Sequence, residues 1–321
     1  MLNFAFMLEV KKISFSYTDA ITLKDISFSV AKGKNLAVIG ESGCGKSTLL
    51  KLIYGLFDTD EGTIHWKKTR VLGPKFNLIP GMDVMKYLAQ DFDLMPYITV
   101  AENVGKFLSN FYPDQKKVRI KELLALVEMT EFANIKAQYL SGGQMQRVAI
   151  ARVLALEPEV LLLDEPFSHI DNFRKNSLRR KLFLYLKAKK ITCIIATHDS
   201  KDILAFSDET LVLQKGKMLV NDTTITVFEN PKSTYVASLF DDVNEIPRHL
   251  FYAGDTTEDT FIAYPFQLKE AAVSNLRVEV IRSYFKGNGY RVESVYKGQW
   301  IYFDSLHSFK KGDLVMLSYK K

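Results

Sequence analysis

The first two thirds of the chain alternates between short apolar runs and segments with helical spacing. The apolar runs have the length of strands that are buried on both faces of a sheet. The segments between them place apolar residues three and four positions apart, as amphipathic helices do. This alternation predicts an α/β fold with a parallel sheet covered by helices. The predicted strands are Asn35–Ile39, Val160–Leu163 and Ile191–Ala196, and the predicted helices are Ser47–Tyr54, Lys116–Phe132, Met145–Leu156 and Asn172–Lys190.

Polar and apolar residues alternate in the segments that flank this core, which is the pattern of antiparallel strands with one exposed face. Leu8–Phe15 is predicted to be an edge strand, and Ile21–Val30 is predicted to be the strand that follows it. Leu211–Leu213 and Met218–Val220 are predicted to form a closing hairpin. Residues 104–139 are predicted to form a small, mainly helical insert.

The last quarter of the chain is a series of short strand-like runs. Glycine-containing turns separate them, for example Gly287-Asn288-Gly289 and Lys297-Gly298. Five short strands with such turns predict a small closed β-barrel. The predicted strands are Phe261–Tyr264, Leu276–Phe285, Tyr290–Tyr296, Trp300–Asp304 and Asp313–Tyr319.

A glycine-rich loop lies between the first predicted buried strand and the helix that follows it. Its sequence, GESGCGKST, fits the phosphate-binding pattern G-x-x-x-x-G-K-[ST]. Such a loop turns successive backbone N–H groups toward one point, where the dipole of the helix also favours an anion. The pattern predicts that Lys46 reaches the β- and γ-phosphates of a nucleoside triphosphate and that the Ser47 hydroxyl binds Mg²⁺. The predicted phosphate-binding residues are Gly40, Glu41, Ser42, Gly43, Cys44, Gly45, Lys46, Ser47 and Thr48.

Two further sites with matching chemistry follow along the chain. Ser141-Gly142-Gly143-Gln144 opens a helix, so its N–H groups are free for a second anion. Asp164 and Glu165 are adjacent carboxylates at the end of a predicted buried strand. Burying them is costly unless they bind a metal or take part in chemistry. Tyr17, upstream of the loop, is either a ring that stacks on a nucleobase or an ordinary buried or surface tyrosine.

Amino-acid composition says little about the class of protein beyond its compartment and the charge of its partners. Cys44 and Cys193 are the only cysteines among 321 residues, which fits a reducing compartment. No stretch is apolar enough for a spanning helix, and the N-terminus does not have the pattern of a signal peptide. The net charge of +6 permits an anionic partner. The basic helix Arg174–Lys190 favours a solvated surface over nucleic-acid binding.

The order of these motifs resembles the ATP-binding subunit of ABC transporters, from about Leu8 to Pro231. The resemblance rests on the phosphate loop, QDFDLMPYITVAEN, LSGGQ, LLLDEP, SHID and THD, in that order. It implies a P-loop NTPase fold: a RecA-like parallel sheet with an antiparallel β subdomain and a helical insert. The C-terminal runs resemble the TOBE (transport-associated, oligonucleotide-binding-like) domain of importer ATPases. The domain limits expected are 8–235 for the ATP-binding domain, 236–250 for a linker and 251–321 for the OB-like barrel.

The resemblance implies a role for each matched residue. Tyr17 stacks on adenine, Asp164 binds the metal and Glu165 is the general base that activates water. Gln90 contacts Mg²⁺ and responds to the membrane subunit, and His198 contacts the γ-phosphate. The signature residues Ser141, Gly142, Gly143 and Gln144 contact ATP that is bound to the other subunit. The cofactors implied are ATP and Mg²⁺.

The expected function is to energise a membrane permease of an importer by ATP-driven dimerisation. The implied partners are a second copy of the chain, an integral-membrane permease and any substrate-binding protein of the system; no nucleic acid is expected. The implied location is the cytoplasm, at the inner face of the cell membrane. Two alternatives stay open: a non-transport ABC ATPase that acts on nucleic acid or the ribosome, and an exporter subunit. The cargo is not encoded in any recognisable motif.

Three segments depart from the family pattern. His169-Ile170 stands where a leucine often precedes the aspartate, and we expect no loss of activity from this change. The segment Arg70–Lys86 is unlike the usual approach to the glutamine loop, and the sequence offers no physical account of it. The barrel is entered through Ala263-Tyr264-Pro265-Phe266 in place of arginine-proline-glutamate.

Overall fold

The computed structural model describes residues 6–18, 20–251 and 259–320. The chain divides into two compact units, residues 1–224 and residues 225–321. Each unit has its own hydrophobic core. The division falls earlier than residue 235, where the sequence suggests that the ATP-binding domain ends.

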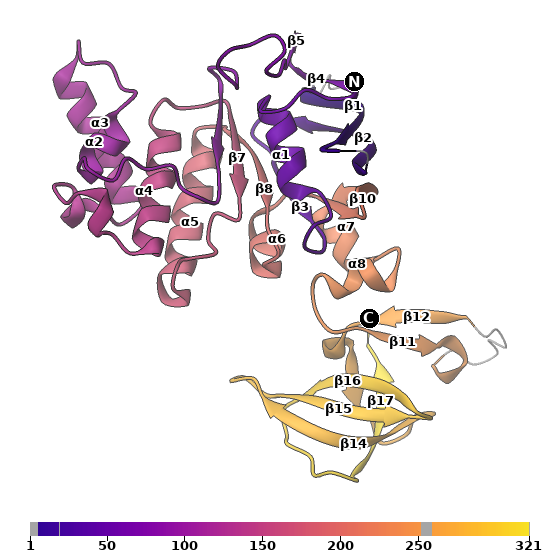
Figure 1. Cartoon of the computed structure of the whole chain (residues 1–321). Helices are drawn as coiled ribbons and strands as arrows, with labels where there is room; N and C mark the ends of the chain where they lie inside the picture. Colours follow the sequence, from indigo (N-terminus) through magenta and orange to yellow (C-terminus); the bar gives the residue numbers. More distant parts are fainter. Residues whose placement is uncertain (1–5, 19, 252–258, 321) are drawn as a thin grey trace. The chain divides into compact units, whose positions relative to one another are not determined.

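The first unit is built on a six-stranded sheet with the order β10-β9-β3-β8-β7-β6 (Figure 1). Strands β3, β8, β7 and β6 are parallel, and β9 also pairs parallel to β3. All residues of β7 and β8 are buried, as their unbroken apolar sequences predict. The closing hairpin is confirmed, because β10 pairs antiparallel to β9. The strands are β3 (Asn35–Ile39), β6 (Met85–Leu88), β7 (Val160–Asp164), β8 (Thr192–Ala196), β9 (Glu209–Gln214) and β10 (Lys217–Thr223).

Helices cover both faces of this sheet. Helix α1 lies on one side of β7, and α4 and α5 lie on the other (Figure 1). The buried face of α1 includes Leu49, Leu50 and Ile53, which belong to the main core. The helices around the sheet are α1 (Lys46–Tyr54), α4 (Gly142–Leu154), α5 (Asn172–Ala188) and α6 (Ser200–Phe206). The predicted α/β fold is confirmed.

A second, antiparallel sheet of the first unit has the order β2-β1-β4-β5. The prediction that Leu8–Phe15 is an edge strand is wrong, because β1 pairs with β2 on one side and with β4 on the other. Its alternating sequence reflects one buried and one exposed face, and a later segment of the chain supplies the second neighbour. The strands are β1 (Phe6–Ser16), β2 (Ile21–Ala31), β4 (Glu61–Trp66) and β5 (Thr69–Arg70).

The insert is helical, as predicted, but its longest helix differs from the prediction. The helix predicted over Lys116–Phe132 begins at Pro113 and ends at Leu126. Glu128 has a φ of 57°, which no α-helix can continue through, and a 3₁₀ turn follows. The insert consists of α2 (Val100–Gly105), α3 (Pro113–Leu126), η1 (Thr130–Phe132) and η2 (Ala137–Tyr139).

The second unit contains a curled five-stranded antiparallel sheet with the order β13-β17-β14-β15-β16. Edge strand β13 contacts edge strand β16, although no hydrogen-bonded ladder joins them among the described residues. The OB-like fold is thus confirmed, with the ladder open at this edge. The elements of this unit are α7 (Thr224–Glu229), α8 (Thr234–Ser238), β11 (Asn244–Pro247), η3 (Arg248–Leu250), β12 (Thr260–Ala263), η4 (Pro265–Gln267), β13 (Leu268–Glu270), β14 (Leu276–Phe285), β15 (Tyr290–Tyr296), β16 (Gln299–Ser305) and β17 (Leu314–Tyr319).

Two details of the predicted barrel are wrong. The predicted strand Phe261–Tyr264 lies in a separate two-stranded sheet, where β12 pairs with β11. The fifth strand of the curled sheet is instead β13, whose three residues are too short to show a pattern in the sequence. Strand β11 lies within residues 236–250, the segment expected to be a linker. A polar four-residue strand such as NEIP is recognisable only through its partner.

Candidate functional site

The phosphate loop connects β3 to α1, as the sequence predicts. Gly40, Gly43 and Gly45 have φ values of 150°, 81° and 106°, which side chains with a Cβ rarely adopt. Gly45 is the N-cap of α1, and no described side chain caps this helix. The first N–H groups of α1 are therefore available to an anion. The Lys46 ammonium donates hydrogen bonds to the carbonyl oxygens of Gly40 and Glu41 at 2.9 and 3.0 Å, so it lies across the mouth of the loop.

Ser47 and Asp164 meet at the end of the sheet. The Ser47 hydroxyl donates to Asp164 Oδ1 at 3.0 Å, and the Tyr87 hydroxyl donates to Asp164 Oδ2 at 3.1 Å. Burial raises the pKa of Asp164, and the hydrogen bonds from Ser47 and Tyr87 act against that rise. A hydroxyl and a carboxylate side by side are the oxygen donors that Mg²⁺ prefers. The pair fits Mg²⁺.

The described residues contain no group of three or more His, Cys, Asp or Glu side chains that could hold a metal. This does not conflict with the fit to Mg²⁺. Mg²⁺ at nucleotide sites is usually bound by one or two protein oxygens together with water and substrate phosphates.

Glu165 and His198 form a second pair at the same edge. His198 Nδ1 lies 2.9 Å from Glu165 Oε1. The parallel register pairs Asp164 with Ala196, so the residues that follow both strands emerge together. Glu165 has a φ of 50°, an uncommon conformation for a residue with a side chain and one found most often at functional sites. Its carbonyl oxygen accepts hydrogen bonds from Gln146 Nε2 at 2.9 Å and from Ser168 Oγ at 3.1 Å, which hold this turn in place.

A buried ion cluster supports the loop that carries His198. Arg179 of α5 is 2% exposed and pairs with Asp199 and Asp202. Burial raises the pKa of Asp202 to about 6, and the charge of Arg179 acts against that rise. At Asp199 burial has the same tendency, but the hydrogen bond and charge of Arg179 prevail and lower the pKa. Asp199 also caps α6 through the N–H of Lys201, so the segment after His198 is fixed at both ends.

Tyr17 and Gln90 lie near the carboxyl ends of these strands, but among the described residues neither forms a hydrogen bond with the Ser47–Asp164 pair or the Glu165–His198 pair. The Tyr17 hydroxyl shares a 3.1 Å hydrogen bond with Thr48 Oγ1, so the ring lies beside the phosphate loop. Its ring is 52% exposed and makes an edge contact with Phe57. Gln90 is exposed and follows β6 at the level where Glu165 follows β7, because Leu88 pairs with Leu163.

The signature residues lie apart from the phosphate loop. Ser141 and Gln144 form a reciprocal capping box at the start of α4, with N–H to oxygen distances of 3.3 and 2.8 Å. They line a cavity of about 450 Å³, and none of its described lining residues belongs to the phosphate loop. The cavity is lined by Phe132, Ser141, Gly142, Gly143, Gln144, Arg147, His169, Ile170, Asp171 and Arg174.

The structure therefore brings most of the predicted site residues together, but not all. The phosphate loop, Asp164, Glu165 and His198 converge at the carboxyl ends of β3, β7 and β8, where open α/β sheets bind ligands. The signature lines a separate cavity. This geometry defines a P-loop nucleotide-binding site, and the signature residues lie outside it.

Comparison with known proteins identifies the family. Residues 23–168 match the family described as ABC transporter. Fe(3+) ions import ATP-binding protein FbpC 2 of Haemophilus influenzae is 35% identical over 246 residues, which cover 76% of this chain and 69% of the relative. Spermidine/putrescine import ATP-binding protein PotA of Pseudomonas fluorescens is 36% identical over 262 residues, 79% of this chain and 71% of the relative.

Solved structures agree with this assignment. The dimeric ATP-binding cassette MJ0796 bound to ADP and Pi superposes with a TM-score of 0.61 and 27% identity, covering 68% of this chain and 99% of that one. The cassette cbiO1 of Clostridium perfringens, part of the ABC transporter complex cbiONQ, gives a TM-score of 0.62 and 27% identity, covering 70% of this chain and 92% of that one. The chain belongs to the ATP-binding subunits of ABC transporters. Its relatives are of the import type, and it is an ATPase that energises transport.

These relatives give no support to the alternative of an ATPase that acts on nucleic acid or the ribosome. Within the described residues, no helix combines the length and apolar character needed to cross a bilayer.

Sequence reasoning missed two residues of the site. Tyr87 was not singled out, although a tyrosine within the strand before Gln90 was a signal. Arg179 was assigned to the solvated basic face of its helix, and this is wrong because its side chain is buried against two carboxylates. Its position next to buried Leu178 and Leu182 on the same helix could have indicated this.

Proposed function

We propose that two copies of this chain bind two ATP molecules at a shared interface and drive a membrane permease by closing and opening. The observation that supports this most directly is the separation of the two anion sites. The N-terminus of α1 at the phosphate loop has no side-chain cap, whereas the signature cavity lies at the capped N-terminus of α4 together with Arg147 and Arg174. A head-to-tail dimer would bring the loop of one copy to the signature of the other at both sites. The relatedness to dimeric MJ0796 supports the same arrangement.

Within each site, Ser47 and Asp164 would hold Mg²⁺, with Gln90 as a further oxygen donor from the edge of β6. Bound Mg²⁺ supplies charge neutralisation for the phosphates. Lys46 would turn from the carbonyl oxygens of its own loop to the β- and γ-phosphates. The ring of Tyr17 lies beside Thr48 and would stack on adenine.

Glu165 would act as general base for the attacking water. Its carboxylate is only 16% exposed and is held by His198, which lies at the same edge as the phosphate loop. The carboxylate would accept a proton from water, and His198 would donate a hydrogen bond to the transferring phosphoryl group. The buried Arg179–Asp199 pair would keep His198 in reach of both partners.

The test of this proposal is Glu165→Gln, which keeps the shape of the side chain and removes its basicity. We expect the variant to bind ATP, to hydrolyse it about 10²–10⁴-fold more slowly, and to elute as a dimer only when Mg²⁺ and ATP are present. Glu131→Gln makes the same change on the exposed surface of the insert and serves as control. Near-normal turnover in Glu165→Gln would remove Glu165 from the base role. A monomer at all ATP concentrations would remove the dimer.

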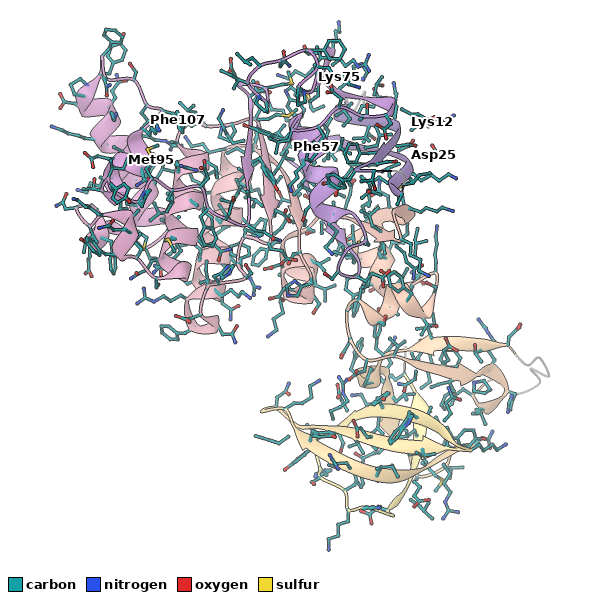
Figure 2. The ribbon with its side chains drawn as sticks, viewed as in Figure 1. Lys12, Asp25, Phe57, Lys75, Met95 and Phe107 are labelled. Atoms are coloured by element: carbon teal, nitrogen blue, oxygen red, sulfur yellow. The ribbon has the colours of Figure 1, made fainter. Side chains whose placement is uncertain are left out.

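The surface that receives the permease is proposed from the segment between the glutamine loop and α2. Tyr97 is 75% exposed, and Leu94, Met95 and Ile98 beside it are half-buried. Asn103 fixes this segment, because its side chain donates to the Met95 carbonyl at 3.0 Å and accepts from the Met95 N–H at 2.9 Å. Lys106 Nζ lies 3.0 Å from the Met95 sulfur, and Figure 2 labels Met95 and Phe107 in this part of the molecule. A loop held in this way, with one exposed and three half-buried apolar side chains, is a suitable docking surface for a short helix of the permease.

Tyr97→Glu tests this surface. We expect the variant to keep basal ATP hydrolysis and to lose transport and co-purification with the membrane fraction, since a buried charge opposes docking. Val273→Glu, at an apolar residue of the second unit that is 88% exposed, is the control. Equal loss of hydrolysis and transport would argue against a docking role. Docking on a permease would place the chain peripherally at the inner face of the membrane. A substrate-binding protein as third component is proposed only on the similarity to import systems.

A further inference from the structure

Tyr87 is not part of the family motifs, but its side chain contacts Asp164 of the proposed metal site. It lies in β6, and the parallel register pairs it with Leu162 of β7. Residues two positions apart share one face of a strand, so Leu162 and Asp164 lie on the same face. The Tyr87 hydroxyl reaches along that face and donates to Asp164 Oδ2 at 3.1 Å.

The two oxygens of Asp164 are thus held by different donors. Ser47 donates to Oδ1 and Tyr87 donates to Oδ2. The terminal torsion of a carboxylate is soft, so one hydrogen bond alone leaves the carboxylate plane poorly defined. The second hydrogen bond fixes this plane and keeps Oδ1 directed at the Ser47 hydroxyl.

The ring of Tyr87 is itself held in place. It packs against the ring of Tyr54 at the end of α1, with a centroid distance of 5.7 Å and an interplanar angle of 34°. Both rings pack on the main core. Gly81 makes room for Tyr54, because a Cβ at position 81 would lie 2.5 Å from the ring carbon Cζ. Within the irregular segment before β6, Gly81 thus leaves the space that the Tyr54 ring occupies.

We propose that Tyr87 is a positioning residue for Mg²⁺: it orients the Asp164 carboxylate toward Ser47 and thereby sets the affinity of the ATP-bound protein for the metal. The inference rests on the proposed function, which places Mg²⁺ at Ser47 and Asp164. Partners that orient metal ligands in this way typically change metal affinity by about 10–100-fold when they are removed.

The test is Tyr87→Phe, which removes only the hydroxyl, made in the slowly hydrolysing Glu165→Gln background. Binding of a fluorescent ATP analogue is measured at equilibrium while Mg²⁺ is titrated. We expect the Mg²⁺ midpoint to rise by about 10-fold and saturating Mg²⁺ to restore binding. Tyr54→Phe is the matched control, because no hydrogen bond of the Tyr54 hydroxyl is found among the described residues, and its midpoint should stay that of the parent.

An unchanged midpoint in Tyr87→Phe overturns the proposal. An equal shift in both variants also overturns it, because the cause would then be packing of the ring cluster. If ATP binding by the parent protein does not depend on Mg²⁺, the proposed metal site itself fails; this outcome is visible before any substitution at Tyr87. Thermal unfolding without nucleotide, unchanged in both variants, shows that the fold is retained.

Discussion

Two neighbouring glycines of the signature provide a sharp test of the packing around the nucleotide site. Gly142 and Gly143 are the first two residues of α4. A Cβ on Gly143 would lie 2.6 Å from the carbonyl oxygen of His169, closer than real Cβ contacts allow. A Cβ on Gly142 would meet only His169 Cβ, at an ordinary contact distance of 3.9 Å. Gly142→Ala should therefore raise the free energy of unfolding, whereas Gly143→Ala should lower it.

The magnitude follows from two opposing terms. Replacing glycine by alanine stabilises a helix interior by about 0.5–1 kcal/mol; at the first two residues of α4 this is an upper bound, and it is the same for both positions. Forcing an added methyl group against packed backbone costs about 1–3 kcal/mol. This cost applies only to Gly143, since the facing atom belongs to the main chain and cannot rotate away. Because the helix term cancels between the two variants, Gly143→Ala should be less stable than Gly142→Ala by about 1–3 kcal/mol.

The two tryptophans allow this difference to be measured in the first unit alone. Trp66 is 2% exposed in β4, and Trp300 is 49% exposed in the second unit. In a Trp300→Phe background, the fluorescence of Trp66 reports unfolding of the ATP-binding unit. Urea titrations of the two glycine variants should then show different midpoints with equal slopes, which assigns the change to stability.

The result that refutes this reasoning is a common midpoint. If Gly142→Ala and Gly143→Ala unfold together, the loop that carries His169 moves aside without cost, and the contact does not constrain the signature. A Gly143→Ala protein more stable than the parent would contradict the geometry in the same way.

The remaining predictions concern the ion cluster behind His198. Arg179→Met leaves Asp199 and Asp202 without their main partner, so we expect the free energy of unfolding to fall by about 3–5 kcal/mol in the same Trp66 assay. ATPase activity should also fall, because the His198 loop loosens. Lys187→Met, on the exposed face of α5, is the control and should change neither quantity. Because burial raises the folded-state pKa of Asp202 to about 6, the folded state binds a proton more tightly than the unfolded state between about pH 4 and 6. Stability should therefore decrease as pH rises through this window, and unfolding of Asp202→Asn should lack this component; an identical pH profile of the two proteins would contradict the raised pKa.

The parts of this fold that could be predicted from sequence are those whose residues interact locally or fill a continuous core. The phosphate loop and the strand before it are contiguous, so a single segment of sequence, Asn35–Thr48, determines their geometry. Strands β7 and β8 are buried on both faces and show as unbroken apolar runs. The α/β class and the positions of Asp164, Glu165 and His198 at one edge follow from these features.

What could not be predicted depends on partners distant in the chain. Strand β1 looks like an edge until β4, some fifty residues later, pairs with it. Arg179 looks like one cation among many until its carboxylate partners in the next helix bury it. Tyr87 looks like an ordinary strand residue, and only the register with β7 brings its hydroxyl to Asp164. In each case the deciding contact crosses between elements that no local pattern connects.

One buried side chain connects the proposed hydrolysis site to the signature cavity within a chain. Gln146 of α4 is 1% exposed. Its amide nitrogen donates to the carbonyl oxygen of Glu165 at 2.9 Å, and its amide oxygen accepts from the N–H of His169 at 3.0 Å. Glu165 begins the loop that leaves the hydrolysis edge, and His169 lines the signature cavity. Both ends of this loop are bonded to one buried amide, so a shift of Glu165 would strain the hydrogen bond that holds His169 at the signature cavity of the same chain. The proposed dimer pairs that signature with the ATP of the other copy, so Gln146 is positioned to make the two hydrolysis sites depend on each other.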